Sequence, residues 1–298
     1  MIRPGWRGKE LVWEGELDEQ LLPTLQREGI RELELNDCNG WIPGPLDILS
    51  SLDGALDALS ILRFGSLERI DPVHMLSRLL KLKIVSGSTG MKDELDLTAF
   101  PHLHGLALEW NKRYVGLTEI ARPDLNMLYL GCYRRSDSFS NFPNLQHLMM
   151  KEVNFPNLEF LRGLHDLRTF WVGANRRFQD LSGIGVHANL EWLIIDGCSQ
   201  IQNGWEEVGR LANLRDFSIE NVGEVSTLTF LEGCRSLETL GIWGNTNILD
   251  GDFTFIDRLP GLRQLKIKPV KRHYTGCTEI DDPNYKRTPF PIQPEQWP

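Results

Sequence analysis

The nonamer LHGLALEWN, residues 103–111, recurs along the chain and decides its fold. Leucine or another apolar residue occupies its first, fourth and sixth positions, and successive copies begin 20 to 26 residues apart. A period of this length indicates a solenoid, in which each repeat stacks on its neighbours. The eleven copies begin at Ile30, Leu56, Leu79, Leu103, Leu125, Leu145, Leu167, Leu190, Leu214, Leu237 and Leu262.

The repeated pattern resembles the template of the leucine-rich-repeat family, LxxLxLxx followed by Asn or Cys, over residues 30–270. The repeats resemble the bacterial type or the short intracellular type. The resemblance implies an α/β fold, a curved horseshoe with a parallel sheet on its concave face and short helices or 3-10 turns on its convex side. Side-chain alternation along a strand places positions 4 and 6 in the core and positions 3, 5 and 7 on the outer face of the sheet.

Position 9 of the template carries a polar ladder in the family that the chain resembles. Asn111, Asn175 and Asn245 stand there, and the resemblance implies that their side chains hydrogen-bond the backbone of the adjacent turn. Cys38 and Cys198 occupy the same position. We therefore expect these two cysteines to have a structural role.

The extent of the repeats divides the sequence into three segments. Residues 1–29 form an N-terminal cap, with an apolar strand at residues 11–13 followed by a helix that has acidic residues in its first turn. Residues 30–270 hold the eleven repeats, and residues 271–298 form a Pro-rich C-terminal cover or a partner-contacting arm of the same single domain. An alternative is that the tail folds back over the outer sheet face through Tyr274, Phe290, Ile292 and Trp297.

Charge and composition narrow the class of partner. The net charge of -9 disfavours non-specific binding to nucleic acid or membranes, both of which need a cationic surface, and favours a basic protein partner. The sequence has no secretory leader pattern and no apolar run near the ~20 residues of a membrane span. Its five cysteines form no CxxC pair. We expect a cytoplasmic protein with reduced thiols.

Large apolar side chains gather on the outer sheet face in the middle of the repeats. Positions on a water-facing sheet are normally polar, and Trp, Tyr and Met are favoured at the centres of protein interfaces. Acidic residues border this surface, which suits a basic partner. The predicted protein-binding residues are Met127, Tyr129, His147, Met149, Trp171, Trp192, Ile194 and Trp243, with Asp196, Asp216 and Glu220 at the border.

Basic pairs follow several strands at positions 10 and 11 of the repeat, where they would share one rim. Such a row could contact an anion or an RNA strand, and a solvated rim is the alternative. The pairs are Lys112 with Arg113, Arg134 with Arg135, and Arg176 with Arg177.

No pattern of catalytic residues emerges from the sequence. The phosphate-binding GxxxxGK[ST], the nucleophile motif GxSxG and the zinc motif HExxH are all missing. His102 and His104 flank one strand residue without a third ligand, so a metal site there is not expected. We expect a protein that is not an enzyme and that has no metal, cofactor or small-molecule substrate.

Resemblance to a repeat family implies protein recognition without choosing the partner. The most specific hypothesis is an intracellular inhibitor, an immunity-type protein that binds a basic toxin domain through the concave face. Three alternatives stay open. They are a secreted effector or adhesin of the internalin type, a phosphatase-regulating scaffold, and RNA binding through the arginine rim.

Overall fold

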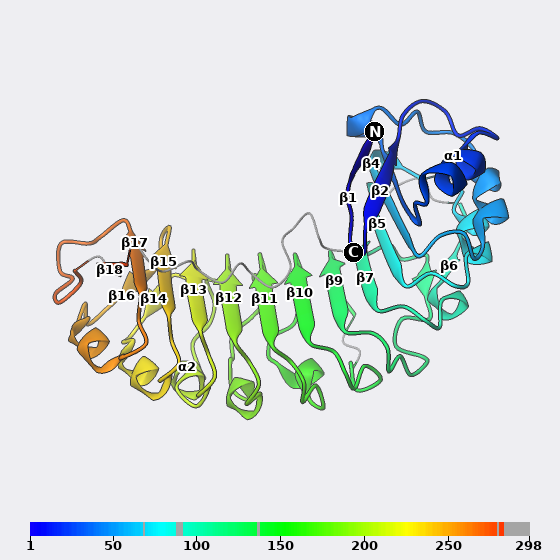
Figure 1. Cartoon of the computed structure of the whole chain (residues 1–298). Coiled ribbons are helices and arrows are strands. Elements are labelled where there is room, and N and C mark those ends of the chain that lie inside the picture. Colours follow the sequence, from blue (N-terminus) through cyan, green and yellow to red (C-terminus); the bar gives the residue numbers. More distant parts are fainter. Residues whose placement is uncertain (68, 88–91, 136–137, 279, 283–298) are drawn as a thin grey trace. The chain divides into compact units, whose positions relative to one another are not determined.

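A computed structural model describes residues 1–67, 69–87, 92–135, 138–278 and 280–282, and these form two compact units (Figure 1). Unit 1 comprises residues 1–132 and unit 2 comprises residues 133–282.

Unit 1 is built on a sheet in which five repeat strands follow the N-terminal cap. The cap contributes β1 (Ile2–Pro4), β2 (Lys9–Trp13) and helix α1 (Leu21–Glu28). β1 pairs antiparallel with β2, and every later pairing in this sheet is parallel. The repeat strands are β3 (Glu32–Asn36), β4 (Ala58–Ser66), β5 (Lys81–Gly87), β7 (Gly105–Glu109) and β9 (Met127–Gly131), and the short β6 (Leu95–Asp96) pairs with β8 (Tyr114–Val115).

Unit 2 repeats the same arrangement with shorter and more uniform strands. Its parallel strands are β10 (His147–Lys151), β11 (Thr169–Gly173), β12 (Trp192–Asp196), β13 (Asp216–Glu220), β15 (Thr239–Trp243) and β17 (Gln264–Lys268). β18 (Ile280–Asp281) closes the edge antiparallel to β17, and β14 (Glu224–Val225) pairs with β16 (Asn247–Ile248).

Short helical turns lie on the side of unit 2 opposite the sheet, as Figure 1 shows. One is the α-helix α2 (Trp205–Val208), and the others are 3-10 turns. The 3-10 turns of unit 2 are η5 (Glu159–Leu161), η6 (Ile184–Val186), η7 (Thr229–Gly233) and η8 (Thr254–Arg258). In unit 1 they are η1 (Asp37–Asn39), η2 (Asp47–Leu52), η3 (Asp71–Met75) and η4 (Leu97–Ala99). The leucine-rich-repeat architecture expected from the sequence is confirmed.

Every strand of unit 2 from β10 to β17 covers positions 3 to 7 of its repeat, in unbroken register. Position 4 carries Leu148, Phe170, Leu193, Phe217, Leu240 and Leu265, all buried. Position 6 is buried in the same way, so the alternation read from the sequence is correct. These two columns form the core, because a side chain at either position has no route to water.

Five repeat strands of unit 2, β10 to β13 and β15, end in a left-handed turn at position 8, whereas Pro269 follows β17. Glu152, Ala174 and Asn221 have positive φ values of 55, 52 and 51° there, and glycine occupies the position in the other two turns, at Gly197 and Gly244. The backbone N–H of Ala174 donates to the carbonyl of Asp196 on the next strand at 2.8 Å. The turn therefore continues the sheet hydrogen bonding while it reverses the chain.

The polar ladder at position 9 is only partly as expected. Asn175 is buried, donates from Nδ2 to the Phe155 carbonyl at 2.9 Å and accepts from the N–H of Arg177 at 3.1 Å. Asn111 is buried too, and Cys198 is buried with its Sγ 3.3 Å from the Asp196 carbonyl. The structural role expected for Cys198 is confirmed.

Two residues at this position do not behave as the template implies. Cys38 is exposed, because the 3-10 turn η1 begins directly after β3 and the Asn36 side chain accepts from the Cys38 N–H. Asn245 is also exposed, and the buried hydroxyl of its neighbour Thr246 accepts from the Val222 N–H at 3.4 Å instead. The expectation of a structural role for Cys38 and Asn245 is therefore wrong.

The two caps differ in detail from the sequence expectation. Helix α1 begins at Leu21, after Asp18 and Glu19, so its first turn contains no acidic residue. Tyr274 lies buried in the last coil, where its hydroxyl accepts from the Ile248 N–H at 3.0 Å and its ring packs against Phe253. Tyr274 therefore belongs to the core and not to the outer sheet face. Phe290, Ile292 and Trp297 lie outside the described residues.

Candidate functional site

The outer face of the unit 2 sheet brings the predicted binding residues of this unit together. We call the side chains at positions 3, 5 and 7 of β10 to β17 the sheet face. Register pairing aligns Met149, Trp171 and Ile194 across three neighbouring strands at position 5. His147 and Trp192 stand at position 3, and Asp196, Glu220 and Trp243 run across adjacent strands at position 7. Neighbouring strands lie ~4.8 Å apart, so these side chains form one continuous surface.

Two tryptophans of the sheet face rest on glycines. A Cβ atom at Gly173 would lie 2.6 Å from the indole of Trp171, and one at Gly241 would lie 2.6 Å from the indole nitrogen of Trp243. Both indoles therefore lie close against the backbone, and both tryptophans are half-buried. Met149 and Ile194 are half-buried as well. These four side chains form an apolar, half-buried part of the sheet face.

Two of the predicted contact residues are buried in the structure. Trp192 is only 7 % exposed and Asp216 only 2 % exposed. Both stand at position 3 on neighbouring strands, where Thr169 and Thr239 are buried too. A repeat template predicts on which face of the sheet a side chain lies. It does not predict how much of that side chain is exposed to solvent. Trp192 and Asp216 therefore lie on the predicted face but expose little surface to a partner.

His147 is held in its neutral form at the edge of the sheet face. Its Nδ1 lies 3.1 Å from the Thr169 hydroxyl. Burial, with a smaller contribution from the charge of Arg168, lowers the pKa of His147 to about 4. The imidazole is therefore a neutral hydrogen-bonding group at physiological pH.

The acidic border of the sheet face is an adjacent pair of carboxylates. Asp196 and Glu220 are register partners on β12 and β13, and Trp243 is the next residue in the same row. Asp196 is half-buried and Glu220 is exposed. Within the described part of the chain, neither carboxylate forms an ion pair with a cationic side chain. This pair offers an unused anionic site beside an indole ring.

Met127 and Tyr129 belong to unit 1, where they stand on β9 at positions 3 and 5. Both are half-buried, and the Tyr129 hydroxyl donates to Glu109 at 2.8 Å. We treat them separately from the sheet face of unit 2, which carries the larger part of the predicted surface.

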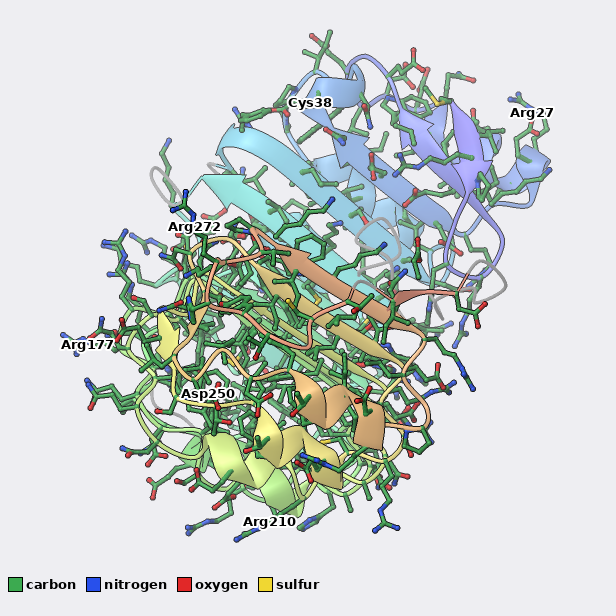
Figure 2. The ribbon with its side chains drawn as sticks, turned by 90° about the vertical axis from the view of Figure 1, so that its left-hand side faces the viewer. Arg27, Cys38, Arg177, Arg210, Asp250 and Arg272 are labelled. Carbon is green, nitrogen blue, oxygen red and sulfur yellow. The ribbon has the colours of Figure 1, made fainter. Side chains whose placement is uncertain are left out.

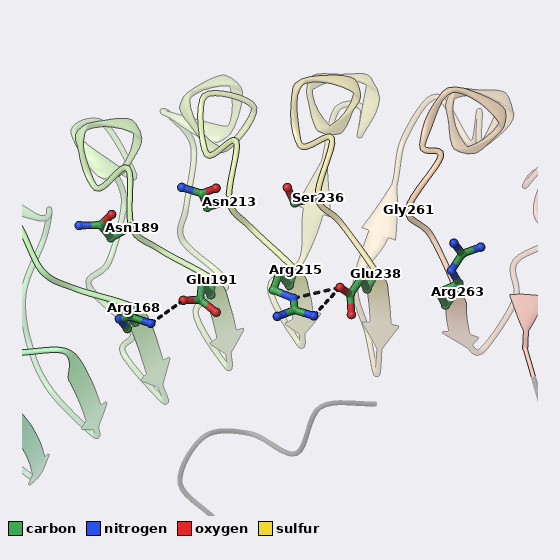
Figure 3. Close-up of a pocket in the computed structure, with 9 residues that line it drawn as sticks. All are labelled: Arg168, Asn189, Glu191, Asn213, Arg215, Ser236, Glu238, Gly261 and Arg263. Carbon is green, nitrogen blue, oxygen red and sulfur yellow. Dashed lines mark hydrogen bonds and ion pairs between the residues drawn. The ribbon is translucent and has the colours of Figure 1, made fainter. Parts of the chain in front are cut away.

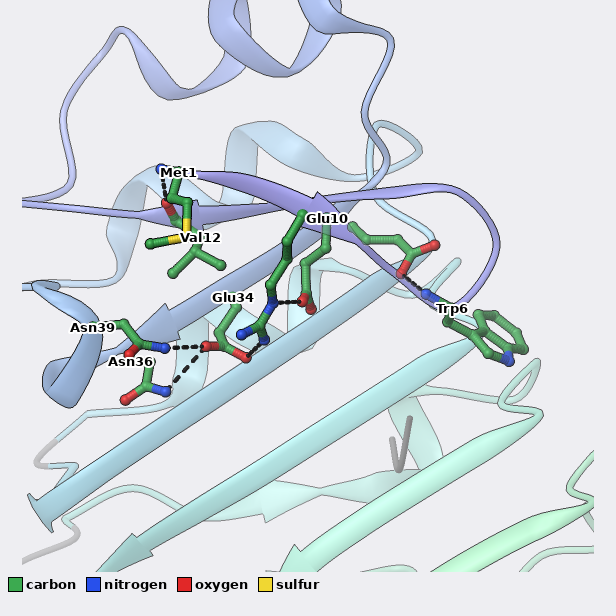
Figure 4. A network of polar contacts seen from close by, with 9 residues as sticks. Met1, Trp6, Glu10, Val12, Glu34, Asn36 and Asn39 are labelled. Atoms are coloured by element: carbon green, nitrogen blue, oxygen red, sulfur yellow. Dashed lines mark hydrogen bonds and ion pairs between the residues drawn. The ribbon is translucent and has the colours of Figure 1, made fainter. Parts of the chain in front are cut away.

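The sheet face of unit 1 is charged rather than apolar near the N-terminus. Arg3 forms ion pairs with Glu10 and Glu34, and Figure 4 shows this network together with the amides of Asn36 and Asn39. The N–H groups of Trp6 and Arg7 both donate to Glu32 at 2.6 Å. Burial lowers the pKa of the nearby Lys81 to about 8 and raises that of Glu10. This network, which has no signature in the repeat template, ties the N-terminal strand pair to the first repeats.

The six basic rim residues are divided between the units. Lys112 and Arg113 are exposed in unit 1. Arg134, Arg135, Arg176 and Arg177 are exposed in unit 2, and three of them line one cavity of about 530 Å³ with Glu152 and Asn154. Arg135 does not line this cavity.

A second cavity, of about 750 Å³, lies on the flank where the chain enters the strands of unit 2 (Figure 3). Position 2 carries alternating charges there, from Arg168 through Glu191, Arg215 and Glu238 to Arg263. Arg168 pairs with Glu191 at 3.1 Å, and Arg215 pairs with Glu238 at 2.6 Å. Aligning position 2 of the repeats would have identified this row, which the sequence analysis left out. Because the charges are mostly paired with one another, the row stabilises the stacking of coils.

The described residues contain no group of three His, Cys, Asp or Glu side chains that could hold a metal ion. Over the same residues, no helix has the length and apolar character needed to cross a membrane.

Comparisons with known proteins identify the fold. No family model matches the sequence, and no curated protein matches it either. Among solved structures, an internalin from Listeria monocytogenes is 18% identical, with a TM-score of 0.50, covering 83% of this chain and 64% of the internalin chain. The structure of PEPR1-AtPEP1 is 15% identical, with a TM-score of 0.51, covering 87% of this chain and 38% of the other. A leucine-rich-repeat protein from Leptospira interrogans is 16% identical, with a TM-score of 0.43, covering 85% of this chain and 81% of the other.

The chain is thus a leucine-rich-repeat protein in its fold. It spans 64% of the internalin structure and 38% of PEPR1-AtPEP1. These likenesses show the fold alone.

Proposed function

We propose that the chain binds a basic protein partner through the sheet face of unit 2. In its most specific form, it is a cytoplasmic inhibitor of the immunity type, which neutralises a toxin domain. The proposal rests on one observation above all. A half-buried apolar row, Met149 with Trp171 and Ile194, adjoins two carboxylates that have no cationic partner in the described chain.

The chemistry of this surface suits a partner that presents an apolar side chain beside an Arg or Lys. The apolar chain would cover the position 5 row and remove it from water, which stabilises association by ~25 cal/mol per Å² of apolar area. The cation would pair with Asp196 and Glu220 and lie near the indole of Trp243, where charge and aromatic ring attract it together. The net charge of -9 adds long-range steering of a basic partner.

Capture from native lysate tests the surface. Wild type, the charge-reversed variant Asp196→Lys with Glu220→Lys, and a control with the same change in charge are compared side by side. The control is Glu206→Lys with Asp257→Lys, two exposed acids on the helical side of unit 2. We expect one protein to be captured by wild type and control and lost by the charge-reversed variant. If all three proteins capture the same partners, the proposal is wrong.

Two further measurements test the finer claims. Producing the captured protein in cells with and without this chain tests inhibition, and we expect growth arrest only without it. A captured protein that is acidic or harmless would exclude the immunity-type function while leaving binding at the sheet face intact. Nuclease treatment of the lysate before capture tests the RNA alternative, since a partner held through RNA would be lost.

A further inference from the structure

The geometry of the arginine rim in unit 2 points to a site for a phosphate group, distinct from the sheet face. We propose that the cavity lined by Arg134, Arg176 and Arg177 binds a phosphate dianion, either free or carried on a phosphorylated side chain. The cavity encloses about 530 Å³ and lies wholly within unit 2.

The three guanidinium groups are not engaged in other polar contacts within the described residues. Arg134, Arg176 and Arg177 are exposed, and none of them forms an ion pair or a side-chain hydrogen bond with a described residue. Figure 2 shows Arg177 projecting outward from the ribbon. By contrast, the arginines of the opposite flank, Arg168 and Arg215, are already paired with glutamates. A cluster of unpaired guanidinium groups attracts anions, and its planar donor forks match the oxygen geometry of phosphate.

The backbone that carries Arg176 and Arg177 is fixed in place. Asn175 is only 1 % exposed and bonds both to the Phe155 carbonyl on the preceding coil and to the N–H of Arg177. Ala174 just before it adopts the left-handed turn, and its N–H is bonded to Asp196 on the following coil. The two arginines therefore start from a turn that is bonded on both sides, which reduces the entropy lost when they close on a ligand.

The charge of the lining selects a compact dianion. The lining includes three arginines and one carboxylate residue, Glu152, whose charge is partly offset by Lys151 at 3.9 Å. A phosphate monoester carries close to two negative charges at pH 7 and balances the remaining positive charge. Asn154 adds an amide to the same lining.

A nucleic-acid strand fits this lining less well. In the repeat between the two arginine turns, positions 10 and 11 carry Asn154 and Phe155, so the basic row is interrupted. Glu152 also stands in the path that a polyanion would follow along the rim. Affinity for a strand rises with the number of phosphates neutralised, and this row offers one cluster instead of a track.

Titration calorimetry on the full chain tests the proposal with two probes, inorganic phosphate and blocked phosphoserine, each at constant ionic strength set with chloride. The test variant is Arg176→Gln with Arg177→Gln. The matched control is Arg162→Gln with Arg235→Gln, two exposed arginines of unit 2 without side-chain partners in the described chain. We expect saturable binding of at least one probe at one site, weakened at least about tenfold in the test variant and unchanged in the control.

The comparison of probes identifies the source of the phosphate. Tighter binding of phosphoserine assigns the site to a phosphorylated protein, and tighter or equal binding of inorganic phosphate assigns it to the free ion. Binding of phosphoserine should weaken between pH 7.5 and 5.5, since its second pKa is about 6. The proposal is wrong if neither probe binds more tightly than chloride, or if the test variant binds as well as wild type. A single-stranded oligonucleotide that binds where both probes fail would also overturn it. Capture at the sheet face can fail without affecting any of these results.

Discussion

The indole of Trp171 lies over the α-carbon of Gly173, two residues farther along β11, so closely that a Cβ atom at residue 173 would fall 2.6 Å from the ring. Both residues point to the same side of the strand, and only glycine leaves space for the indole in this position. The orientation of the central aromatic residue of the sheet face therefore depends on a neighbour with no side chain.

Gly173→Ala should displace the Trp171 indole and weaken partner capture without unfolding the protein. Residue 173 has no positive φ value, so alanine fits the backbone and the effect comes from the side chain alone. We expect a loss in affinity of at least about tenfold and a change in unfolding free energy near 1 kcal/mol. Gly44→Ala, at a glycine with nothing within 4 Å of the added atom, serves as the control. Undiminished capture by Gly173→Ala would show that the orientation of Trp171 does not matter.

The guanidinium of Arg122 is predicted to be essential for the stability of unit 1. It is only 1 % exposed and donates to the carbonyls of Phe100, Leu97 and Gly116 at 2.8, 2.6 and 3.0 Å. Arg122→Met would leave these buried carbonyls without donors, so we expect the free energy of unfolding to fall by about 3 to 5 kcal/mol. Chemical denaturation measures this, with the exposed Arg235→Met as control. A loss below about 1 kcal/mol would mean that water replaces the guanidinium.

Stability should fall with acid through His147. Its pKa is lowered to about 4 in the folded chain, mainly by burial, against about 6.5 in an unfolded chain. Above pH 6.5 both states are neutral. Between pH 6.5 and 4 only the unfolded state takes up the proton. The free energy of unfolding therefore falls by at most about 3 kcal/mol over this pH range.

Denaturation series at several pH values check this dependence. His147→Gln should lose stability less steeply than wild type between pH 6.5 and 4, and the exposed His102→Gln should follow wild type. Parallel curves for wild type and His147→Gln would rule out His147 as the source.

The sequence predicts the fold well because core and surface positions alternate within a fixed period. Phe170 and Leu193, for example, could be assigned to the core from spacing alone, and both are buried. The same spacing correctly placed Trp171 and Ile194 beside one another on the sheet face.

Exposure was much less predictable than position, because it depends on neighbours that the template does not specify. Trp192 and Asp216 were placed on the correct face but are buried. Cys38 has the correct spacing for the ladder, but a 3-10 turn directs it to solvent. The repeat spacing predicts a row of basic residues, whereas the restriction of the cavity to Arg134, Arg176 and Arg177 depends on how the turns fold.

Thiol labelling should separate the exposed cysteine from the core cysteines. Cys38 is exposed, whereas Cys198 and Cys234 are buried, and burial raises the pKa of both core thiols to about 12. The thiolate attacks a sulfur of the disulfide reagent and displaces the other as a thiolate, so at pH 8 we expect the accessible Cys38 to react in the folded protein and the two core thiols to react only after denaturation. Mass spectrometry locates the label, and Cys38→Ser is the control. Labelling of Cys198 without denaturant would contradict the packing of the ladder.

Truncation after Val270 should destabilise unit 2, because residues 271–282 complete its last coil. The Tyr274 hydroxyl accepts from the buried Ile248 N–H at 3.0 Å, and β18 pairs with the edge strand β17. Removing both would leave a buried donor unpaired and an open sheet edge, which favours aggregation. We expect a lower denaturation midpoint and concentration-dependent association. Tyr274→Phe isolates one part of this effect, since it removes only the acceptor for the Ile248 N–H. It should lower the free energy of unfolding by about 1 to 3 kcal/mol. If the truncated chain unfolds at the wild-type midpoint, the segment is an arm and the last coil is complete without it.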